Sequence, residues 1–194
     1  MGLISNGTTI FDNGALAVGG SMTFISSATA SASASIEFTL GDYKEYKFFF
    51  VNMHPATDAV TFQFNFSTDN GSNYNVTKTT TWFQSFHTEG GASGSLSYEN
   101  GYDLAQSTSD QPIVYQVGNG SDEQVSGMVQ VFNPSSTTYV KHFIGRCSSY
   151  YYSNANLCGH FAGYANTTSA LTNIRFKMSS GNIDDGKILM FGVN

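Results

Sequence analysis

The sequence has few of the features that cross-link small proteins or charge their surface. Its 194 residues include only 2 Cys, 3 Pro and 1 Trp, and charged residues make up 11% of it, against roughly a quarter in an average soluble domain. Two cysteines cannot form the disulfide framework of a small secreted domain. A chain of this length must therefore hold its fold by burying apolar surface in one core.

The cysteines, Cys147 and Cys158, leave two interpretations open. They are either buried thiols or, if they flank a hairpin, a disulfide that an extracellular particle would permit. Neither belongs to a CxxC pair, and the group Cys147, Cys158 and His160 is only a weak match to metal-ligand spacing. We predict no metal and no cofactor.

The charge balance argues against two classes of partner. The net charge is -6, with 8 Lys and Arg in total, whereas proteins that bind a phosphate backbone need clustered basic residues. No apolar run reaches the 18 residues of a membrane span, and the first residues lack the basic and apolar regions of a signal peptide. We expect no nucleic acid, no membrane, and a protein kept in a cytoplasm until it is released.

Aromatic residues are abundant, with 16 Phe and 11 Tyr, and they favour β-sheets. Apolar residues recur at every second position, most clearly over 60–67 and 174–193, and no window has helical periodicity with capping signals. We count about ten short strands separated by Gly, Asn and Asp turns. The pattern predicts an all-β fold, an antiparallel β-sandwich that is jelly-roll-like, with an extended N-terminal arm.

The turns predict local pairing of strands. Residues 69–71 and 179–186 carry the Asp, Asn and Gly of tight turns, so we expect hairpins between 60–67 and 74–82, and between 174–178 and 189–193. The segment 46–51 is apolar at both alternating positions, which is typical of a central strand covered on both faces. Lys78 shares a face with Tyr74 and Val76, and its charge indicates that this face of the strand is no longer part of the core there. His142 is expected to pack within the sheet.

The chain divides into an N-terminal arm, residues 1–21, and a single β-sandwich domain, residues 22–194, with a Gly/Ser-rich loop near 87–111. A loop of that length often carries function. The apolar side chains of the arm would be poorly covered on a monomer, so this segment is either a flexible terminus or an arm whose apolar side chains are candidates for contact with a neighbouring protein. These candidates are Leu3, Ile4, Ile10, Phe11 and Leu16.

No catalytic constellation is evident. The acidic pairs at 42 and 45, 122–123 and 184–185 lie at turns, where Asp commonly bonds its own backbone, and no G-x-S-x-G motif occurs. We therefore predict no catalytic residues and no enzyme. Aromatic side chains stack on sugars and are enriched at interfaces, and the candidates for either contact are Trp82, Tyr150, Tyr151 and Tyr152.

Three stretches carry a resemblance to a known group: 43–58 (YKEYKFFFVNMHPATD), 131–142 (VFNPSSTTYVKH) and 176–187 (FKMSSGNIDDGK). Together they resemble a family of virion-associated β-rich structural proteins from tailed phages of marine bacteria and cyanobacteria. The similarity covers residues 22–194, and the third stretch is its most specific part.

The resemblance implies a non-enzymatic virion protein, assembled in the host cytoplasm. We expect a head decoration or cement protein that binds the major capsid protein or other virion proteins, and the alternative is a tail-fibre or receptor-binding module for cell-surface glycan. A surface rich in Ser, Thr and Asn is easier to bury than one of Lys and Glu. A homo-oligomer is therefore expected, with a trimer favoured.

Overall fold

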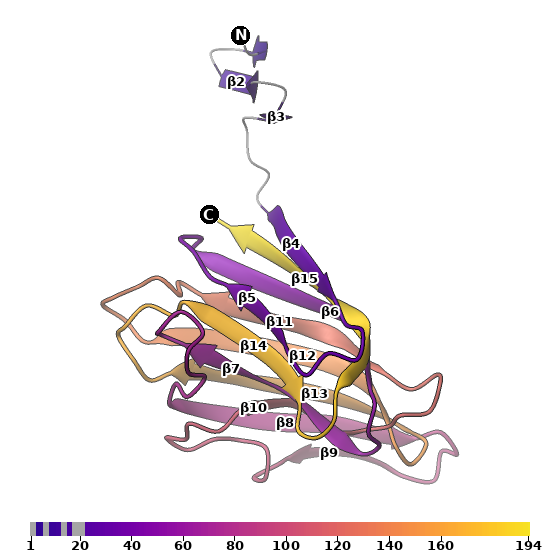
Figure 1. Ribbon diagram of the computed structural model, residues 1–194. Helices are drawn as coiled ribbons and strands as arrows, with labels where there is room; N and C mark the ends of the chain where they lie inside the picture. The colour runs from indigo at the N-terminus through magenta and orange to yellow at the C-terminus, as the bar shows by residue number, and fades with distance from the viewer. Residues whose placement is uncertain (1–2, 6–7, 13–14, 17–21) are drawn as a thin grey trace.

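The structure of the chain is a computed structural model that describes residues 3–5, 8–12, 15–16 and 22–194. These residues form an all-β fold with antiparallel pairing throughout, and no helix occurs among them (Figure 1). The predicted fold class is confirmed.

The described residues form fifteen strands. Three short ones near the N-terminus, β1 (Leu3–Ser5), β2 (Thr8–Asp12) and β3 (Ala15–Leu16), form a small sheet. The remaining twelve are β4 (Thr23–Thr29), β5 (Ile36–Thr39), β6 (Glu45–Pro55), β7 (Val60–Ser67), β8 (Lys78–Thr88), β9 (Gly94–Tyr98), β10 (Gln111–Val117), β11 (Val125–Phe132), β12 (Lys141–Tyr151), β13 (Ala155–Ala165), β14 (Asn173–Met178) and β15 (Ile183–Val193).

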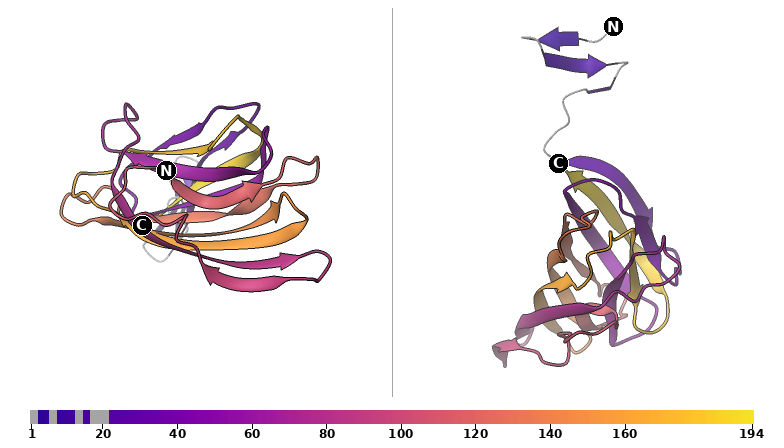
Figure 2. Two further views of the ribbon diagram at one scale, coloured as in Figure 1. Left: turned by 90° about the horizontal axis from the view of Figure 1, so that it is seen from below. Right: turned by 90° about the vertical axis from the view of Figure 1, so that its left-hand side faces the viewer.

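The twelve strands form two layers. One is an eight-stranded sheet with the order β4-β15-β6-β11-β12-β13-β8-β9, and the other is a four-stranded sheet with the order β5-β14-β7-β10. A single pairing, Val117 with Tyr151, joins the layers at one end. At the other end the chain crosses from β4 to β5 just after a bridge between Ser33 and Ile183 of β15. The two views in Figure 2 show the resulting sandwich.

The strand order is that of a jelly roll. Early strands pair with late ones in reverse sequence, β4 with β15, β5 with β14, β6 with β11 and β7 with β10. This is a long antiparallel ribbon rolled into two sheets, β4-β15-β6-β11 and β5-β14-β7-β10. The strands β12, β13, β8 and β9 are insertions that widen the first sheet, so one layer has twice as many strands as the other.

Both predicted hairpins are wrong, although their strands exist. β7 pairs with β10 and β14 rather than with β8, and β14 pairs with β5 and β7 rather than with β15. In each case the turn carries the chain across to the opposite sheet. Alternation of apolar residues shows which face of a strand is buried and not which strand lies beside it, because crossing the core buries the same face as a hairpin would.

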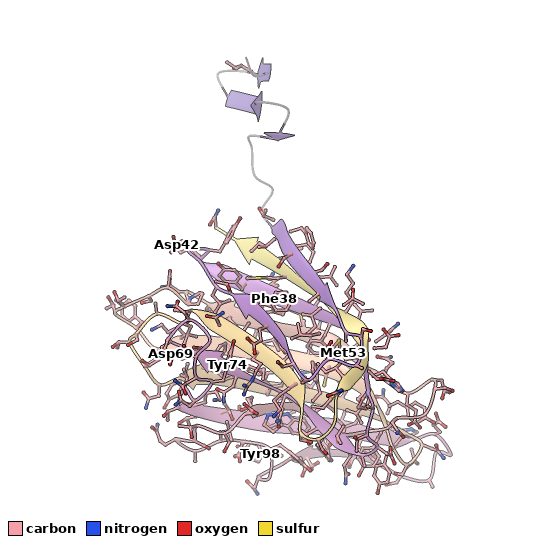
Figure 3. All side chains as sticks on the ribbon, in the orientation of Figure 1. Phe38, Asp42, Met53, Asp69, Tyr74 and Tyr98 are labelled. Atoms are coloured by element: carbon pink, nitrogen blue, oxygen red, sulfur yellow. The ribbon has the colours of Figure 1, made fainter. Side chains whose placement is uncertain are left out.

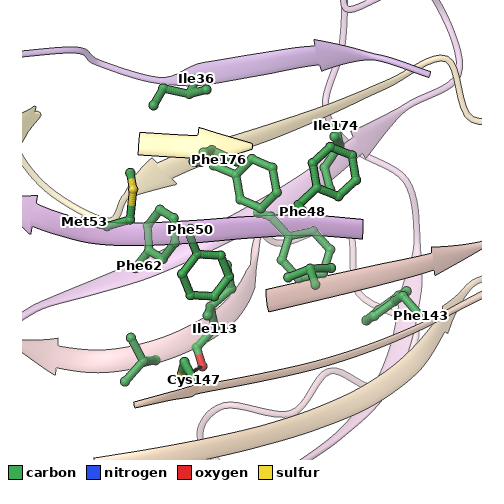
Figure 4. Packing of buried hydrophobic residues seen from close by; sticks show 14 of the residues in the cluster. Ile36, Phe48, Phe50, Met53, Phe62, Ile113, Phe143, Cys147, Ile174 and Phe176 are labelled. Carbon is green, nitrogen blue, oxygen red and sulfur yellow. Dashed lines mark hydrogen bonds between the residues drawn. The ribbon is translucent and has the colours of Figure 1, made fainter. Parts of the chain in front are cut away.

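The core is a layer of phenylalanine rings between the sheets (Figure 4). Phe48 and Phe50 of β6 meet Phe176 of β14 and Phe62 of β7, with ring centroids 5.5 and 5.4 Å apart. Tilted and edge-on ring pairs of this kind stabilise a core by more than their buried area alone. The alternation that predicted the strands therefore builds the contact between the two layers.

Two lysines are buried at the edge of this core, contrary to what Lys78 indicated. Nζ of Lys78 donates hydrogen bonds to Asn65 Oδ1 at 2.6 Å and to the Val76 carbonyl oxygen at 2.7 Å. Lys141 likewise donates to two backbone carbonyl oxygens. Burial lowers the pKa of Lys78 to about 8. A buried ammonium group is tolerated because its protons have partners.

The predicted arm and the predicted loop near 87–111 also differ in detail from the structure. The arm was expected to lack regular structure, yet three short strands pair within it. The loop near 87–111 contains β9, which forms a hairpin with β8. Polar contacts hold parts of that segment in place. In one of them the Leu104 amide donates a hydrogen bond to the Thr80 hydroxyl at 2.8 Å.

Candidate interaction surface

The side of the eight-stranded sheet that faces away from the core, here called the outer face, carries an unusual number of apolar side chains. Neighbouring strands align one residue each into a row that crosses seven strands, β15 to β9 in spatial order. We call this the outer-face row: Leu189, Phe49, Met128, Arg146, His160, Phe83 and Tyr98. None of these side chains is buried, whereas Ile188, Phe48 and Trp82, each of which directly precedes a member of the row, are buried.

Several large apolar residues of the outer face are exposed. The exposed fraction is 44% for Phe83, 45% for Ile144, 50% for Tyr98 and 54% for Phe24. Tyr98 lies on β9, at the edge of the sheet (Figure 3). The open face of an antiparallel sheet is ordinarily polar, so a set of this kind is a candidate interaction site.

Aromatic contacts order these side chains before any partner arrives. Phe191 meets Phe24 and Phe49 edge-on, with centroids 5.5 and 5.6 Å apart. The His160 ring stacks on Phe83 at 5.0 Å with an angle of 6° between the planes. Between these groups lies an open hollow of 420 Å³, lined by Thr81, Phe83, Met128, Gln130, Ile144, Gly145, Arg146, His160, Phe161 and Ala162.

The outer-face hollow and the loops at the ends of the strands carry charges of opposite sign. The hollow on the outer face has Arg146 as its one permanently charged residue. A second hollow of 540 Å³ lies at the loops and is lined by Asn52, His54, Ser121, Asp122, Glu123, Gln124, Asp184 and Asp185. The outer face is thus apolar to weakly basic on a chain with a net charge of -6. Acidic repulsion between copies would be weakest there.

One feature of the sequence indicates this surface, although it predicts that the residues there are buried. The apolar residues on both sides of β6 predicted a strand covered on both faces. β6 does lie between β15 and β11, but Phe49 is half-buried and Val51 is 44% exposed. The second apolar side of β6 is open in the isolated chain. His142, expected to pack within the sheet, is likewise exposed on the outer face.

Trp82 is a correction among the predicted site residues. It is fully buried and lies 5.6 Å from both Tyr102 and Tyr115, measured between ring centroids. Those two tyrosine rings stack on each other at 4.0 Å. Trp82 faces the interior because it shares the inward side of β8 with Lys78 and Thr80. It cannot contact a glycan or another subunit.

The three consecutive tyrosines differ in their contacts and their exposure. Tyr151 is half-buried and its hydroxyl bonds Gln116. Tyr150 bonds Asn154 at 3.1 Å, and Tyr152 is 43% exposed. Tyr150 lines a polar hollow of 350 Å³ with His87, Thr88, Glu89, Asp122, Gln124, Ser148, Ser149, Ala155 and Asn156. Of the predicted aromatic candidates, Tyr152 is exposed and Tyr150 is half-buried, so both reach the surface of the domain.

Of the predicted arm contacts, Ile4 is 62% exposed on β1. The side chains of Leu3, Ile10, Phe11 and Leu16 lie outside the described part of the structure. Their backbone belongs to the small sheet, in which Phe11 is paired with Leu3 and Leu16. The prediction that these side chains contact a capsid or a subunit stays a prediction.

The cysteines lie on opposite sides of the sheet, so they form neither a disulfide nor a shared metal site. Cys147 is buried, and burial raises the pKa of its thiol to about 12. Cys158 is half-buried and faces outward beside His160. Within the described residues no group of three or more His, Cys, Asp or Glu side chains is arranged to hold a metal ion.

Comparison with models of known families, with curated proteins and with solved structures finds no match to this chain. Among the residues that the structure describes, no helix has the length and apolar character needed to cross a membrane.

Proposed function

We propose that this chain is a non-enzymatic structural protein of a tailed-phage virion, most directly a decoration or cement protein on the capsid surface. The observation that carries the proposal is the exposed apolar outer face of the eight-stranded sheet. A surface of this kind on a stable sandwich serves contact with other protein surfaces. Two further features support it, namely the jelly-roll topology, which recurs in viral capsid domains, and the sequence resemblance.

The size of the outer face suits assembly. Eight strands have seven spacings of about 4.8 Å, so the face is roughly 34 Å wide, and strands of 11 residues give it a similar length. That area, roughly 1,000 Å², matches the 800 Å² or so that each partner contributes to a standard interface. In this proposal copies of the domain pack through the outer face, and the arm, residues 1–21, attaches them to the major capsid protein.

Reconstitution on particles that lack the protein tests this function. Quantitative mass spectrometry of washed particles should find hundreds of copies of the wild-type chain per particle. Deletion of residues 1–20 should leave the domain folded and abolish attachment. The double variant Phe83→Ser and Ile144→Ser should lower occupancy at least tenfold. Lys177→Ser, on the four-stranded sheet, is the matched control and should leave occupancy unchanged.

Occupancy that both the deletion and the double variant leave unchanged would contradict the proposal. A count of about a dozen copies per particle would favour a tail protein instead.

One observation favours that second candidate, a receptor-binding module for cell-surface glycan. The hollow beside Tyr150 combines an aromatic ring with carboxylates and amides, which is the chemistry that proteins use for sugars. Titration of the protein with oligosaccharides from the host surface should perturb the Tyr150 ring resonances. Tyr150→Ala should abolish that binding, and Tyr139→Ala, a change at another exposed tyrosine, should not.

A further inference from the structure

Cys158 and His160 form a pair of metal-ligating side chains on the outer face. They are two residues apart on β13, so both project to the same side of the sheet. Sγ of Cys158 lies 3.4 Å from Nε2 of His160. His160 belongs to the outer-face row, and its ring is held against Phe83. The pair is therefore oriented on rigid strands rather than on a loop.

The separation of the two atoms suits a shared metal ion. In tetrahedral zinc sites Zn–S is about 2.3 Å and Zn–N about 2.1 Å, which places a sulfur and a nitrogen ligand about 3.6 Å apart. The described residues offer no third His, Cys, Asp or Glu for the same ion. One chain thus supplies half of a four-ligand set, and the set is incomplete without a partner.

We propose that two copies of this chain bind one zinc ion between their outer faces, each copy contributing Cys158 and His160. The proposal rests on the proposed function in one respect, because it uses the outer face as a contact between copies. It adds the ligand chemistry that joins them. The two copies would be related by a two-fold axis through the metal, the commonest symmetry of soluble homo-oligomers.

The geometry of stacked sheets supports a second copy as the partner. Sheets that pack face to face lie about 10 Å apart, so a metal midway is about 5 Å from each backbone. A cysteine side chain and one Zn–S bond span about that distance. The apolar side chains of Phe83, Ile144 and Met128 lie beside His160, and the small side chains of Ser85 and Ser148 flank Cys158. Two such faces would exclude water around the ion.

The binding step is balanced without an oxidant or reductant. Each Cys158 thiol loses its proton to the solvent, and each thiolate forms one Zn–S bond. Each neutral His160 forms one Zn–N bond through Nε2. Two thiolates neutralise the dication, so the buried site carries no net charge.

The experiment uses the full-length protein freed of metal with a chelator and kept under a non-thiol reductant. Zinc sulfate is titrated in while light scattering measures the mass. We expect the mass to rise from 20.9 kDa to twice that value, with half a zinc ion bound per chain and reversal by chelator. Cobalt in place of zinc should produce the absorption band of cobalt–thiolate charge transfer.

Matched variants separate the site from general effects. Cys158→Ser and His160→Gln should each weaken zinc binding by at least about 100-fold and keep the protein monomeric. Cys147→Ala, which removes the thiol on the opposite side of the sheet, should bind zinc as the wild type does.

Three results would overturn the inference: no zinc-dependent change in mass, one zinc per chain without dimers, or dimers that dissociate with a thiol reductant rather than with chelator. Particle attachment is measured separately. Wild-type attachment to particles together with any of these three results would therefore leave the proposed function standing while the metal site falls.

Discussion

At the scale of single residues, the direction of a side chain decides its chemistry. Cys147 and Cys158 lie on neighbouring strands with nearly the same register, since Cys147 pairs with Gly159. The offset of one residue sends one thiol into the core and the other outward. Reactive thiols are exposed and readily deprotonated, and Cys147 is neither.

This difference predicts selective alkylation. In the native protein at pH 8, iodoacetamide should modify Cys158 and leave Cys147 intact, because burial raises the pKa of Cys147 to about 12. Peptide mass spectrometry measures the two sites, and both should react after denaturation in guanidinium. Equal rates at the two thiols in the native protein would contradict the placement of Cys147.

A second residue-scale prediction concerns pH. The pKa of Lys78 is lowered from 10.5 to about 8, so between those values the unfolded chain holds a proton that the folded chain has released. The free energy of unfolding should therefore rise by about 2 kcal/mol between pH 7 and 10. Lys141, whose pKa is also lowered by burial, acts in the same direction.

Above pH 10 the sign reverses. Burial raises the pKa of Tyr74 and of Tyr115 to about 12, so the unfolded chain loses these protons first and stability falls between pH 10 and 12. Urea denaturation at a series of pH values measures the profile. Lys78→Met should flatten the rise between pH 8 and 10, and a rise of the same size in that variant would show that other groups cause it.

Sequence reasoning at this scale failed for a charged residue that is buried and for an aromatic residue that lies on the inward side of its strand. Lys78 indicated an exposed face because a charged residue is rarely buried, and the partners that make its burial tolerable come from Asn65 on another strand. Trp82 was assigned to a surface because tryptophan is frequent at interfaces. Its position on the inward side of β8 could be derived only by knowing which alternate residues of that strand face the core.

At the scale of elements, close packing between strands explains several glycines. A Cβ at Gly145 would lie 2.1 Å from the ring of Phe161 on the neighbouring strand. We expect Gly145→Ala to lower the free energy of unfolding by about 2 kcal/mol, because the ring must shift within a packed core. Gly101→Ala, where no atom lies within 4 Å of the added Cβ, is the control. Equal effects in urea denaturation would contradict this packing.

Strands were predicted well and their partners poorly. Period-two alternation located β6, β7, β14 and β15, because side-chain direction is a local property. Pairing is not local in this fold, since β5 and β14 are neighbours although the residues of β6 to β13 lie between them in sequence. The Asp-Asn-Gly turn at 69–71 permits a hairpin but does not require one, and burial of Phe64 and Phe66 between two sheets decides the outcome.

At the scale of the whole molecule, the nested pairing predicts slow folding. The pairs β4 with β15 and β5 with β14 close long loops before their contacts stabilise the fold. We expect refolding on the order of milliseconds to seconds. Trp82 is the sole tryptophan and is fully buried, so its fluorescence in stopped-flow dilution reports core formation. Microsecond refolding would contradict this topology-limited picture.

The fold class followed from the sequence, whereas the interaction surface did not. A preference for strands along the whole chain can be inferred from composition and from the alternation of apolar residues alone. The outer-face row needs the register of seven strands, and its members, such as Leu189 and Tyr98, are far apart in the chain. Only the apolar second side of β6 gave a local sign of it.

The nested pairing also brings the two ends of the domain together. Thr23 is paired with Gly192, so the arm leaves the domain beside the last strand of the chain (Figure 1). An affinity tag or fluorescent protein fused after Asn194 would sit at the root of the arm and obstruct whatever the arm reaches. Labels for imaging the protein on its particle belong on the turn at 89–93 between β8 and β9 instead, where every residue is exposed and no atom lies within 4 Å of a Cβ added at Gly90 or Gly91.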